Sequence, residues 1–343
     1  MRQQNGLGGH MHKSVWLVPT LIVLVGCGGE KGTSGGTVVV NPGPSPTTSP
    51  PPVTLNTGEV KPRGDAAYIV AAMELSTTGG VAQTNGVITA GSTTDRIVTL
   101  DPPGFSADYN AGYRLADGVN SANFGAAQLT ADTTRPNGNG VVFFASTSGA
   151  AQNYLALYQQ SEFISSFKGS GYVTARYGGT GGWQHTVVNG ATRRTRLKYF
   201  GYGSPTPTAS MPRTGVVRYS LLGSGNYATD TDLWFLSSTS SVSVTVDFST
   251  GTATGTMSLG GENFYKNQVG GVGSFPIRGN VAGNMVTNGF AGAGIGPVAD
   301  VSGQFRIMFV GPAAEELVLT YVFGNGTRTG VGAAVGFVHP YAL

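Results

Sequence analysis

The stretch SVSVTVDF (241–248) alternates apolar and polar residues along its whole length. Alternation with a period of two places one kind of side chain on each face of a β-strand. The apolar face would consist of Val242, Val244, Val246 and Phe248. Ser-Thr-Gly follows, and Gly251 can adopt the positive φ that a tight turn requires. The alternation then resumes over residues 252–259, so we predict a β-hairpin.

The same alternation returns near the C-terminus in GQFRIMFV (303–310), in EELVLTYVF (315–323) and after Gly-Asn-Gly (324–326). The predicted apolar positions are Phe305, Ile307, Phe309, Leu317, Leu319, Tyr321 and Phe323, and then Val331, Val335 and Phe337 on one side of a last strand. Short antiparallel strands with one apolar face can bury it, and lose their edges, by closing into a barrel. We predict an all-β chain whose C-terminal part is a soluble antiparallel barrel of about eight strands, with its apolar sides inward.

Three motifs in the second half of the chain, in the same order, resemble the barrel of transferrin-binding protein B and related surface lipoproteins. They are FGYGSPTPTASMPRTGVVRYSLLG (200–223), VDFSTGTATGTMS (246–258) and GQFRIMFVGPAAEELVLTYVF (303–323). The resemblance, to the solute-binding-like branch of that family, implies a handle-like β region before the barrel. It also implies a receptor that captures a protein or iron-related ligand through loops and barrel rim, without catalysis.

Near the N-terminus, VWLVPTLIVLVG (15–26) is an apolar run of the length of a signal-peptide core and is too short to span a bilayer comfortably. Leu24-Val25-Gly26-Cys27 follows at once and resembles the lipobox of bacterial lipoproteins. We therefore predict a signal peptide over 1–26 and lipidation of Cys27, with a diacylglycerol and a palmitate as membrane anchor. Gly28, in place of aspartate, favours the outer membrane under the sorting rule of such proteins. The alternative is a conventional or uncleaved signal with an incidental cysteine.

The composition divides the remainder of the chain. Residues 27–64 are rich in glycine, proline, serine and threonine, which predicts a semi-rigid tether. Residues 65–168 are predicted to form the β-rich, handle-like domain, in which SEFISSFKG (161–169) could form a turn or two of helix. The predicted barrel domain then covers 169–343 and begins with a hairpin turned at Asn189-Gly190.

The charge of the chain excludes one class of partner. Charged residues are 11% of the chain and its formal net charge is only +3, so we expect no nucleic-acid partner. One basic cluster stands out, formed by Arg193, Arg194, Arg196 and Lys198. We interpret it as solvated charges on an exposed strand, with a phosphate or lipid site as the alternative.

Few residues offer catalytic chemistry. Beyond the predicted signal peptide only His185 and His339 are histidines, neither has a metal-ligand spacing, and Cys27 is the sole cysteine. Glu315 and Glu316 are adjacent, so on a strand they would point to opposite faces and serve a structural purpose. The glycine-rich AGAGIGP (291–297) is followed by proline rather than a helix, which favours a barrel loop over a phosphate loop. We predict no enzyme, no metal and no cofactor.

Two functions remain compatible with these features of the sequence. The first is a lipid-anchored binding protein of the bacterial outer membrane, facing either the outside or the periplasm. The second is a structural or assembly lipoprotein of the cell envelope with no small ligand. The anchor makes the membrane a partner in both cases, and the scarcity of acid, base and nucleophile argues against an enzyme.

Overall fold

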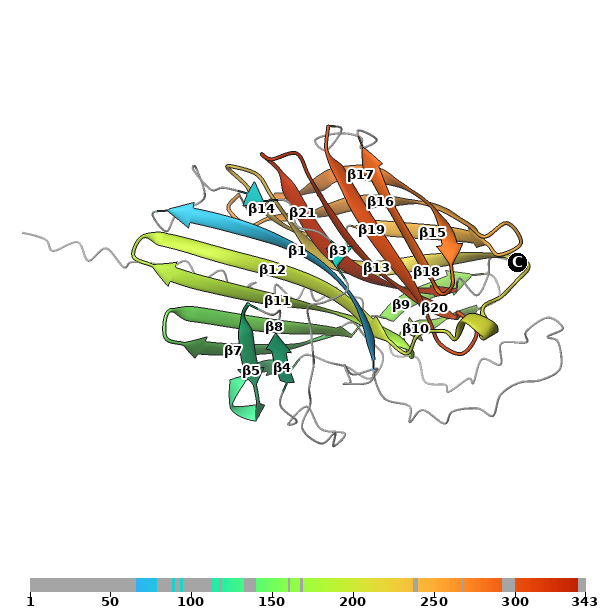
Figure 1. Cartoon of the computed structure of the whole chain (residues 1–343), viewed down its shortest axis with the longest axis horizontal. Coiled ribbons are helices and arrows are strands. Elements are labelled where there is room, and N and C mark those ends of the chain that lie inside the picture. The colour runs from blue at the N-terminus through green and yellow to red at the C-terminus, as the bar shows by residue number, and fades with distance from the viewer. Residues whose placement is uncertain are drawn as a thin grey trace, which may run out of the picture.

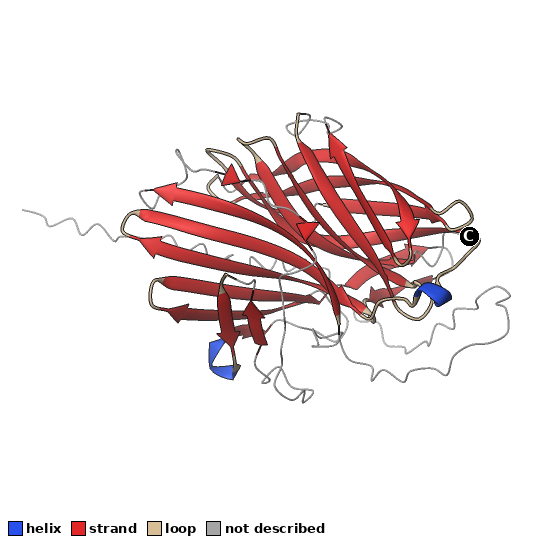
Figure 2. Cartoon of the chain, in the orientation of Figure 1, coloured by secondary structure: helices blue, strands red, loops and turns tan. Residues whose placement is uncertain are grey.

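A computed structural model describes residues 66–78, 88–89, 93–94, 113–116, 119–132, 140–159, 161–166, 169–236, 240–266, 268–291 and 300–338. Most of these residues form antiparallel strands (Figure 2). The two exceptions in regular structure are short 3₁₀ helices, η1 (Ala126–Gln128) and η2 (Thr208–Ser210). The prediction of an all-β fold is therefore confirmed.

The C-terminal half forms a closed barrel. Its strands are β13 (Val216–Ala228), β14 (Leu233–Leu236), β15 (Ser241–Asp247), β16 (Thr252–Asn263), β17 (Gln268–Ala282), β18 (Met285–Ala291), β19 (Ser302–Val310), β20 (Glu316–Gly324) and β21 (Thr329–Val338). Pairing runs in order from β13 through β15 to β21, and β21 pairs back with β13 along ten residue pairs. The short β14 lies between β13 and β16, beyond the end of β15, so eight strand positions make the ring. The predicted barrel of about eight strands is confirmed.

A second sheet lies beside the barrel and is called the handle sheet below (Figure 1). Its strands are β1 (Ala67–Thr78), β2 (Ile88–Thr89), β3 (Thr93–Thr94), β6 (Leu129–Asp132), β7 (Gly140–Ser148), β8 (Ala151–Gln159), β11 (Gly178–Asn189) and β12 (Thr192–Gly203). The order is β2-β1-β12-β11-β8-β7-β6, and β3 also pairs with β1. Two separate hairpins accompany it: β4 (Tyr113–Ala116) with β5 (Ser121–Phe124), and β9 (Ser161–Ser166) with β10 (Gly169–Thr174).

Two local predictions are corrected by this arrangement. The hairpin turned at Gly190 exists, with φ of +58° at the glycine, but its strands β11 and β12 pair with β8 and β1 of the handle sheet. The barrel sheet therefore begins at Val216 and not near residue 169. Residues 161–166 form a strand and not a helix. The division of the chain into domains at residue 168 stays a prediction.

The barrel interior is filled by its own side chains. The predicted apolar faces of β15, β16, β19 and β20 all point inward, and their residues belong to one buried cluster that includes Val244, Met257, Ile307, Leu319 and Phe323. Within it the ring centroid of Phe323 lies 4.8 Å from that of Phe275 and 5.9 Å from that of Tyr227. Aromatic pairs at such separations add to the free energy gained from burying their surface.

The last strand departs from the prediction. Val331, Val335 and Phe337 do share one side of β21, but they face outward and pack against the handle sheet. The inward side of β21 consists of glycines and an alanine, because Gly332 lies opposite Tyr321 and Ala334 opposite Leu319. A Cβ at Gly332 would collide with the Tyr321 ring, so the small residues make room for the aromatic side chains of β20.

The outer side of β20 and β21 forms the contact with the handle sheet. Ala71, Met73, Leu197 and Tyr199 of that sheet pack on Val322 of the barrel in one buried cluster. A neighbouring cluster joins Ile69 to Val310, Val318, Val335 and Phe337. A Cβ added at Gly201 would lie 2.8 Å from the Cβ of Val318, so the lack of a side chain lets the two layers approach. As a result β20 is buried at every position.

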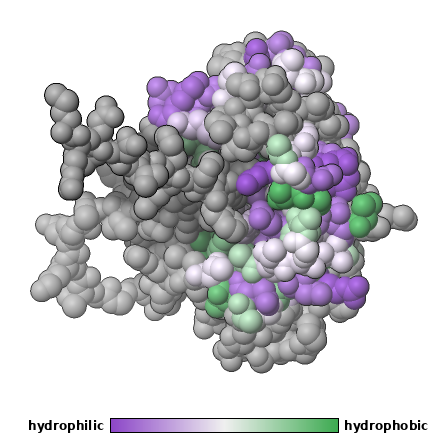
Figure 3. Space-filling view, turned by 90° about the vertical axis from the view of Figure 1, so that its left-hand side faces the viewer, coloured by the Kyte–Doolittle hydropathy of each residue, from purple (hydrophilic) through white to green (hydrophobic). Residues whose placement is uncertain are grey.

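The other face of the handle sheet is also covered. Trp183, Phe200 and Leu155 of the sheet form a buried cluster with Tyr113 and Phe124 of the β4–β5 hairpin. On the surface shown in Figure 3, hydrophilic and hydrophobic described residues are mixed in small areas.

Several predictions fall outside the described residues. They concern the signal peptide (1–26), Cys27 and the tether (27–64), as well as His339 and most of the glycine-rich loop. Within the described part of the chain, no helix is long and apolar enough to cross a membrane.

Candidate functional site

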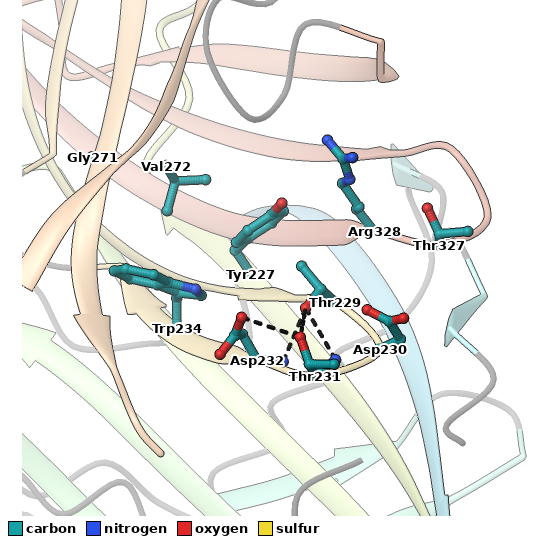
Figure 4. Close-up of a pocket in the computed structure, with 10 residues that line it drawn as sticks. All are labelled: Tyr227, Thr229, Asp230, Thr231, Asp232, Trp234, Gly271, Val272, Thr327 and Arg328. Carbon is teal, nitrogen blue, oxygen red and sulfur yellow. Dashed lines mark hydrogen bonds between the residues drawn. The ribbon is translucent and has the colours of Figure 1, made fainter. Parts of the chain in front are cut away.

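A hollow of about 580 Å³ lies at one end of the barrel and is called the mouth hollow below (Figure 4). Trp234 of β14 pairs directly with Tyr227 of β13, so both side chains point to the inner side of the barrel wall. Val272 of β17 is also part of the barrel core. The hollow is lined by Tyr227, Thr229, Asp230, Thr231, Asp232, Trp234, Gly271, Val272, Thr327 and Arg328.

The floor of the mouth hollow is aromatic. The Tyr227 ring stacks on Phe323 at an angle of 27°, and Phe323 in turn contacts Phe275 deeper in the barrel. Burial raises the pKa of Tyr227, although Arg328 opposes that effect, so its hydroxyl stays protonated at neutral pH. A ligand would meet a closed aromatic floor there.

One wall of the hollow is the turn between β13 and β14, and its own hydrogen bonds hold it in shape (Figure 4). The hydroxyl oxygen of Thr229 accepts from the backbone N–H of Thr231 at 3.2 Å and of Asp232 at 2.9 Å. Asp232 then accepts from Asn263 Nδ2 at 2.8 Å and from Lys266 Nζ at 2.7 Å. Partial burial would raise the pKa of Asp232, but the bonds from Lys266 and Asn263 outweigh it and lower that pKa.

The opposite wall is the turn between β20 and β21. The side-chain oxygen of Asn325 accepts from the N–H of Thr327 and of Arg328, both at 3.1 Å. Arg328 forms an ion pair with Asp300 at 3.3 Å, and Asn325 Nδ2 donates to the same carboxylate at 2.9 Å. Both walls are therefore held before any ligand arrives, which lowers the entropic cost of binding.

Exposed apolar side chains lie beside the hollow at the turn between β16 and β17. Val269 is 68% exposed and Phe264 is 36% exposed. The turn is tied to the site twice, because the N–H of Phe264 donates to Leu233 O at 2.7 Å and Lys266 binds Asp232. The edge of the mouth hollow thus combines exposed apolar side chains with charged side chains that are held in ion pairs.

These residue types favour recognition over chemistry. Tryptophan, tyrosine and arginine dominate the binding energy of protein interfaces, and polar rims surround them. Asp232 is committed to Asn263 and Lys266, so its carboxylate is engaged by the protein itself. Among the residues that the structure describes, no three histidine, cysteine, aspartate or glutamate side chains are placed to hold a metal ion.

The basic cluster predicted to be solvated divides into two kinds of residue. Arg194 is 63% exposed, and both Arg194 and Arg196 bind the carboxylate of Glu74 on β1. Lys198 is buried instead, with its Nζ 4.4 Å from the centroid of the Trp183 ring. Burial lowers the pKa of Lys198 to about 7. For Lys198 the prediction of a solvated charge is wrong, because it shares a face of β12 with Arg194 and Arg196 but lies farther along the strand, directly opposite the buried Trp183.

His185 lies in the same covered layer. Its Nδ1 is 2.7 Å from Asn153 Oδ1, and the indole N–H of Trp183 donates to that oxygen at 3.3 Å. Burial lowers the pKa of His185, and the charge of Arg196 lowers it further. His185 is therefore a hydrogen-bonded core residue in the handle sheet, remote in the chain from every residue of the mouth hollow.

The two adjacent glutamates separate as predicted. Glu315 accepts from the N–H of Ala313 at 2.8 Å. Glu316 points the other way and accepts from the N–H of Arg176, Tyr177 and Gly178 at 2.7, 2.9 and 3.0 Å. Burial nevertheless raises the pKa of Glu316 to about 7. This carboxylate links the start of β20 to the segment that enters β11.

The residues of the mouth hollow were not singled out from the sequence. They come from two turns with their flanking strands and from strand β17, the outermost residues lie about 100 positions apart in the sequence, and only barrel closure brings them together. One signal existed locally, since TDTDLW (229–234) places acids and hydroxyls directly before a tryptophan in a turn.

Comparison with known proteins gives likeness in structure alone. No protein-family model and no curated protein matches the sequence. A variant of transferrin-binding protein B from Haemophilus parasuis is similar at 11% identity and a TM-score of 0.36, over 81% of this chain and 77% of that one. Transferrin-binding protein B from Neisseria meningitidis is similar at 12% identity and a TM-score of 0.40, over 79% of this chain and 43% of that one.

A smaller structure is also similar. The haemoglobin receptor HpuA from Kingella denitrificans, in complex with human haemoglobin, matches at 14% identity and a TM-score of 0.30, over 64% of this chain and 94% of that one. Solved structures of the family that the sequence motifs resemble are thus among those to which this fold is similar.

Proposed function

We propose that this chain is a lipid-anchored binding protein of the bacterial cell envelope that captures a protein ligand at the mouth hollow, without catalysis. The observation that carries the proposal is the combination of Trp234, Tyr227 and Arg328 between two turns that are fixed by their own hydrogen bonds. The exposed Val269 extends the apolar contact area beyond the hollow. A rigid aromatic centre with a charged rim is what tight protein recognition requires.

The anchor belongs to the same proposal. Cys27 follows an apolar run and precedes a proline-rich stretch, an order that suits a domain held away from a membrane. Cys27→Ser should move the protein from the membrane fraction to the soluble fraction of cells. Continued sedimentation of the variant with membranes would contradict lipid anchoring while leaving the mouth hollow untouched.

Three probes test the proposed binding at the mouth hollow. Surface plasmon resonance on the purified protein would compare haemoglobin, iron-loaded transferrin and haemin, the first two because proteins that share the fold are named for binding them. For a protein probe that binds, Trp234→Ala should weaken affinity at least about tenfold, as expected of a central interface residue.

A matched control variant distinguishes a loss of affinity caused at the mouth hollow from a loss caused by any change on the barrel surface. Thr245 lies on the outer side of β15, away from the turns that line the mouth hollow. Thr245→Ala should therefore leave affinity unchanged. Binding of haemin alone would redirect the proposal to an iron compound. Failure of all three probes would favour a structural or assembly lipoprotein.

A further inference from the structure

The handle sheet and the mouth hollow are joined through one side chain, Asn226 on β13. Asn226 alternates with Tyr227, which faces the barrel core, so its amide lies on the outer side of the wall. The hydroxyl of Tyr199, on β12 of the handle sheet, donates to Asn226 Oδ1 at 2.6 Å. Asn226 Nδ2 then donates to the backbone oxygen of Trp234 at 3.4 Å. A continuous path of hydrogen bonds therefore runs from β12 to the strand that carries the indole of the hollow.

The strand at the end of this path is short. β14 has four residues, pairs with β13 at four positions and pairs with β16 at three. Its two end residues, Leu233 and Leu236, are buried, whereas Trp234 between them is only partly buried. A bond to the main chain of Trp234 from a side chain that is itself fixed would restrict the orientation of the indole.

The donor at the start of the path is well fixed. Tyr199 is 5% exposed and belongs to the apolar cluster between the two sheets, beside Met73 and Val331. Burial raises the pKa of its hydroxyl well above the ordinary value, so the group remains a donor throughout the physiological range.

We infer that Tyr199 is a positioning residue for the binding site: through Asn226 it sets the orientation of Trp234 in the mouth hollow. The handle sheet then has a part in recognition without touching the ligand. The part in recognition rests on the proposed function, but the orientation of Trp234 does not.

The test observes Trp234 directly. The protein is labelled with 5-fluorotryptophan, and the ¹⁹F resonance of Trp234 is assigned by its loss in Trp234→Phe; the other tryptophans are Trp16 and Trp183. Tyr199→Phe should shift and broaden the Trp234 resonance and leave that of Trp183 in place. Asn226→Ala should do the same, and the double variant should add nothing to Asn226→Ala, because both changes break one path.

A matched control removes an equal bond elsewhere. The Tyr219 hydroxyl donates to Ala314 O, also at 2.6 Å and also buried, but at a different part of the barrel. Tyr219→Phe should leave the Trp234 resonance unmoved. The inference is overturned if Tyr199→Phe behaves like Tyr219→Phe, or if the effects of Tyr199→Phe and Asn226→Ala add.

Binding measurements separate this inference from the proposed function. With haemoglobin as probe, Tyr199→Phe should weaken affinity by about threefold to tenfold, in the same direction as Trp234→Ala. Full affinity in Tyr199→Phe beside a loss in Trp234→Ala would overturn the positioning role and keep the site. A shifted ¹⁹F resonance in a protein that binds none of the three probes would support the positioning role and contradict the proposed function.

Discussion

Strands β15 and β20 line the same barrel, but only β15 keeps one side toward water. Positions in β15 alternate between buried and more exposed, whereas all nine positions of β20 are buried. The difference arises because the handle sheet covers the outer side of β20, where Val318 and Val322 lie. The comparison teaches that alternation in a strand reports how many of its faces are covered, and not whether the strand belongs to the barrel.

The largest effect is expected at Glu316, the first residue of β20. Glu316→Ala would leave the N–H groups of Arg176, Tyr177 and Gly178 without their acceptor, and that of Gly178 is buried. An unsatisfied buried donor costs about 1 to 3 kcal/mol and each other lost bond about 0.5 to 1.5 kcal/mol, so the free energy of unfolding should fall by at least about 2 kcal/mol in urea titrations. Glu315→Ala is the control, because that carboxylate accepts from an exposed turn, and its effect should stay under about 1 kcal/mol. Equal effects of the two variants would refute the role of Glu316.

The same carboxyl predicts a dependence of stability on pH. Its pKa rises from 4.5 to about 7 on folding, so the folded state binds more protons between these values. The free energy of unfolding contributed by Glu316 is then greatest below pH 4.5, falls as the pH rises toward 7, and changes no further above it. The fall should be on the order of 3 kcal/mol, since each pKa unit corresponds to about 1.4 kcal/mol. Unfolding curves of Glu316→Gln should lack this fall, and an identical pH profile would contradict the assignment.

A pair of conservative exchanges sharpens the contrast between the two strands. Val318→Thr places a hydroxyl in the contact between β20 and the handle sheet and should cost about 1 to 3 kcal/mol of unfolding free energy. Thr245→Val, on the outer side of β15, should change it by no more than about 0.5 kcal/mol. Thermal unfolding followed by circular dichroism measures both. Similar costs at the two positions would mean that the handle sheet does not cover β20 in solution.

An effect of similar size is expected at β21, the partner of β20. Gly332→Ala adds a methyl group against the Tyr321 ring and should cost about 1 to 3 kcal/mol through overpacking, at the lower end if the ring moves. Gly332→Ala combined with Tyr321→Phe should recover part of that loss, because the contacting hydroxyl is gone. Urea titrations of both variants measure the free energy of unfolding. If the double variant recovers none of the loss, the Tyr321 hydroxyl is not the source of the strain.

Much of the fold could be predicted because the barrel strands carry its periodicity locally. The inward faces at Val244, Ile307 and Leu319 followed from alternation alone, and so did the turn at Gly251. The direction of Val331 could not follow, since β21 has apolar residues on one side and mainly glycines on the other, and such a pattern predicts that the side with the larger residues points inward. Only the rings of β20 explain why glycine lines the core there.

Local sequence patterns could not predict which sheet contains β11 and β12, and they could not predict the mouth hollow. Both failures have the same physical cause. Alternation fixes which way a side chain points but not which strand lies next to it, so β12 was assigned to the wrong sheet. Trp234 and Arg328 are brought together by closure of the ring, a long-range event with no local pattern. Lys198 shows the reverse case, in which a charge was expected in water but lies over Trp183.

Strand β20 is the shared wall of two buried clusters, the barrel core and the contact with the handle sheet. Native-state hydrogen exchange, read by NMR at single amides, tests it most directly. The account predicts that the amides of Val318 and Thr320 exchange more slowly than those of Val244 and Thr245 on β15, by at least tenfold. Equal or faster exchange on β20 would contradict it, because a strand with one solvent-exposed face would then be as well protected as a strand that is buried on both faces.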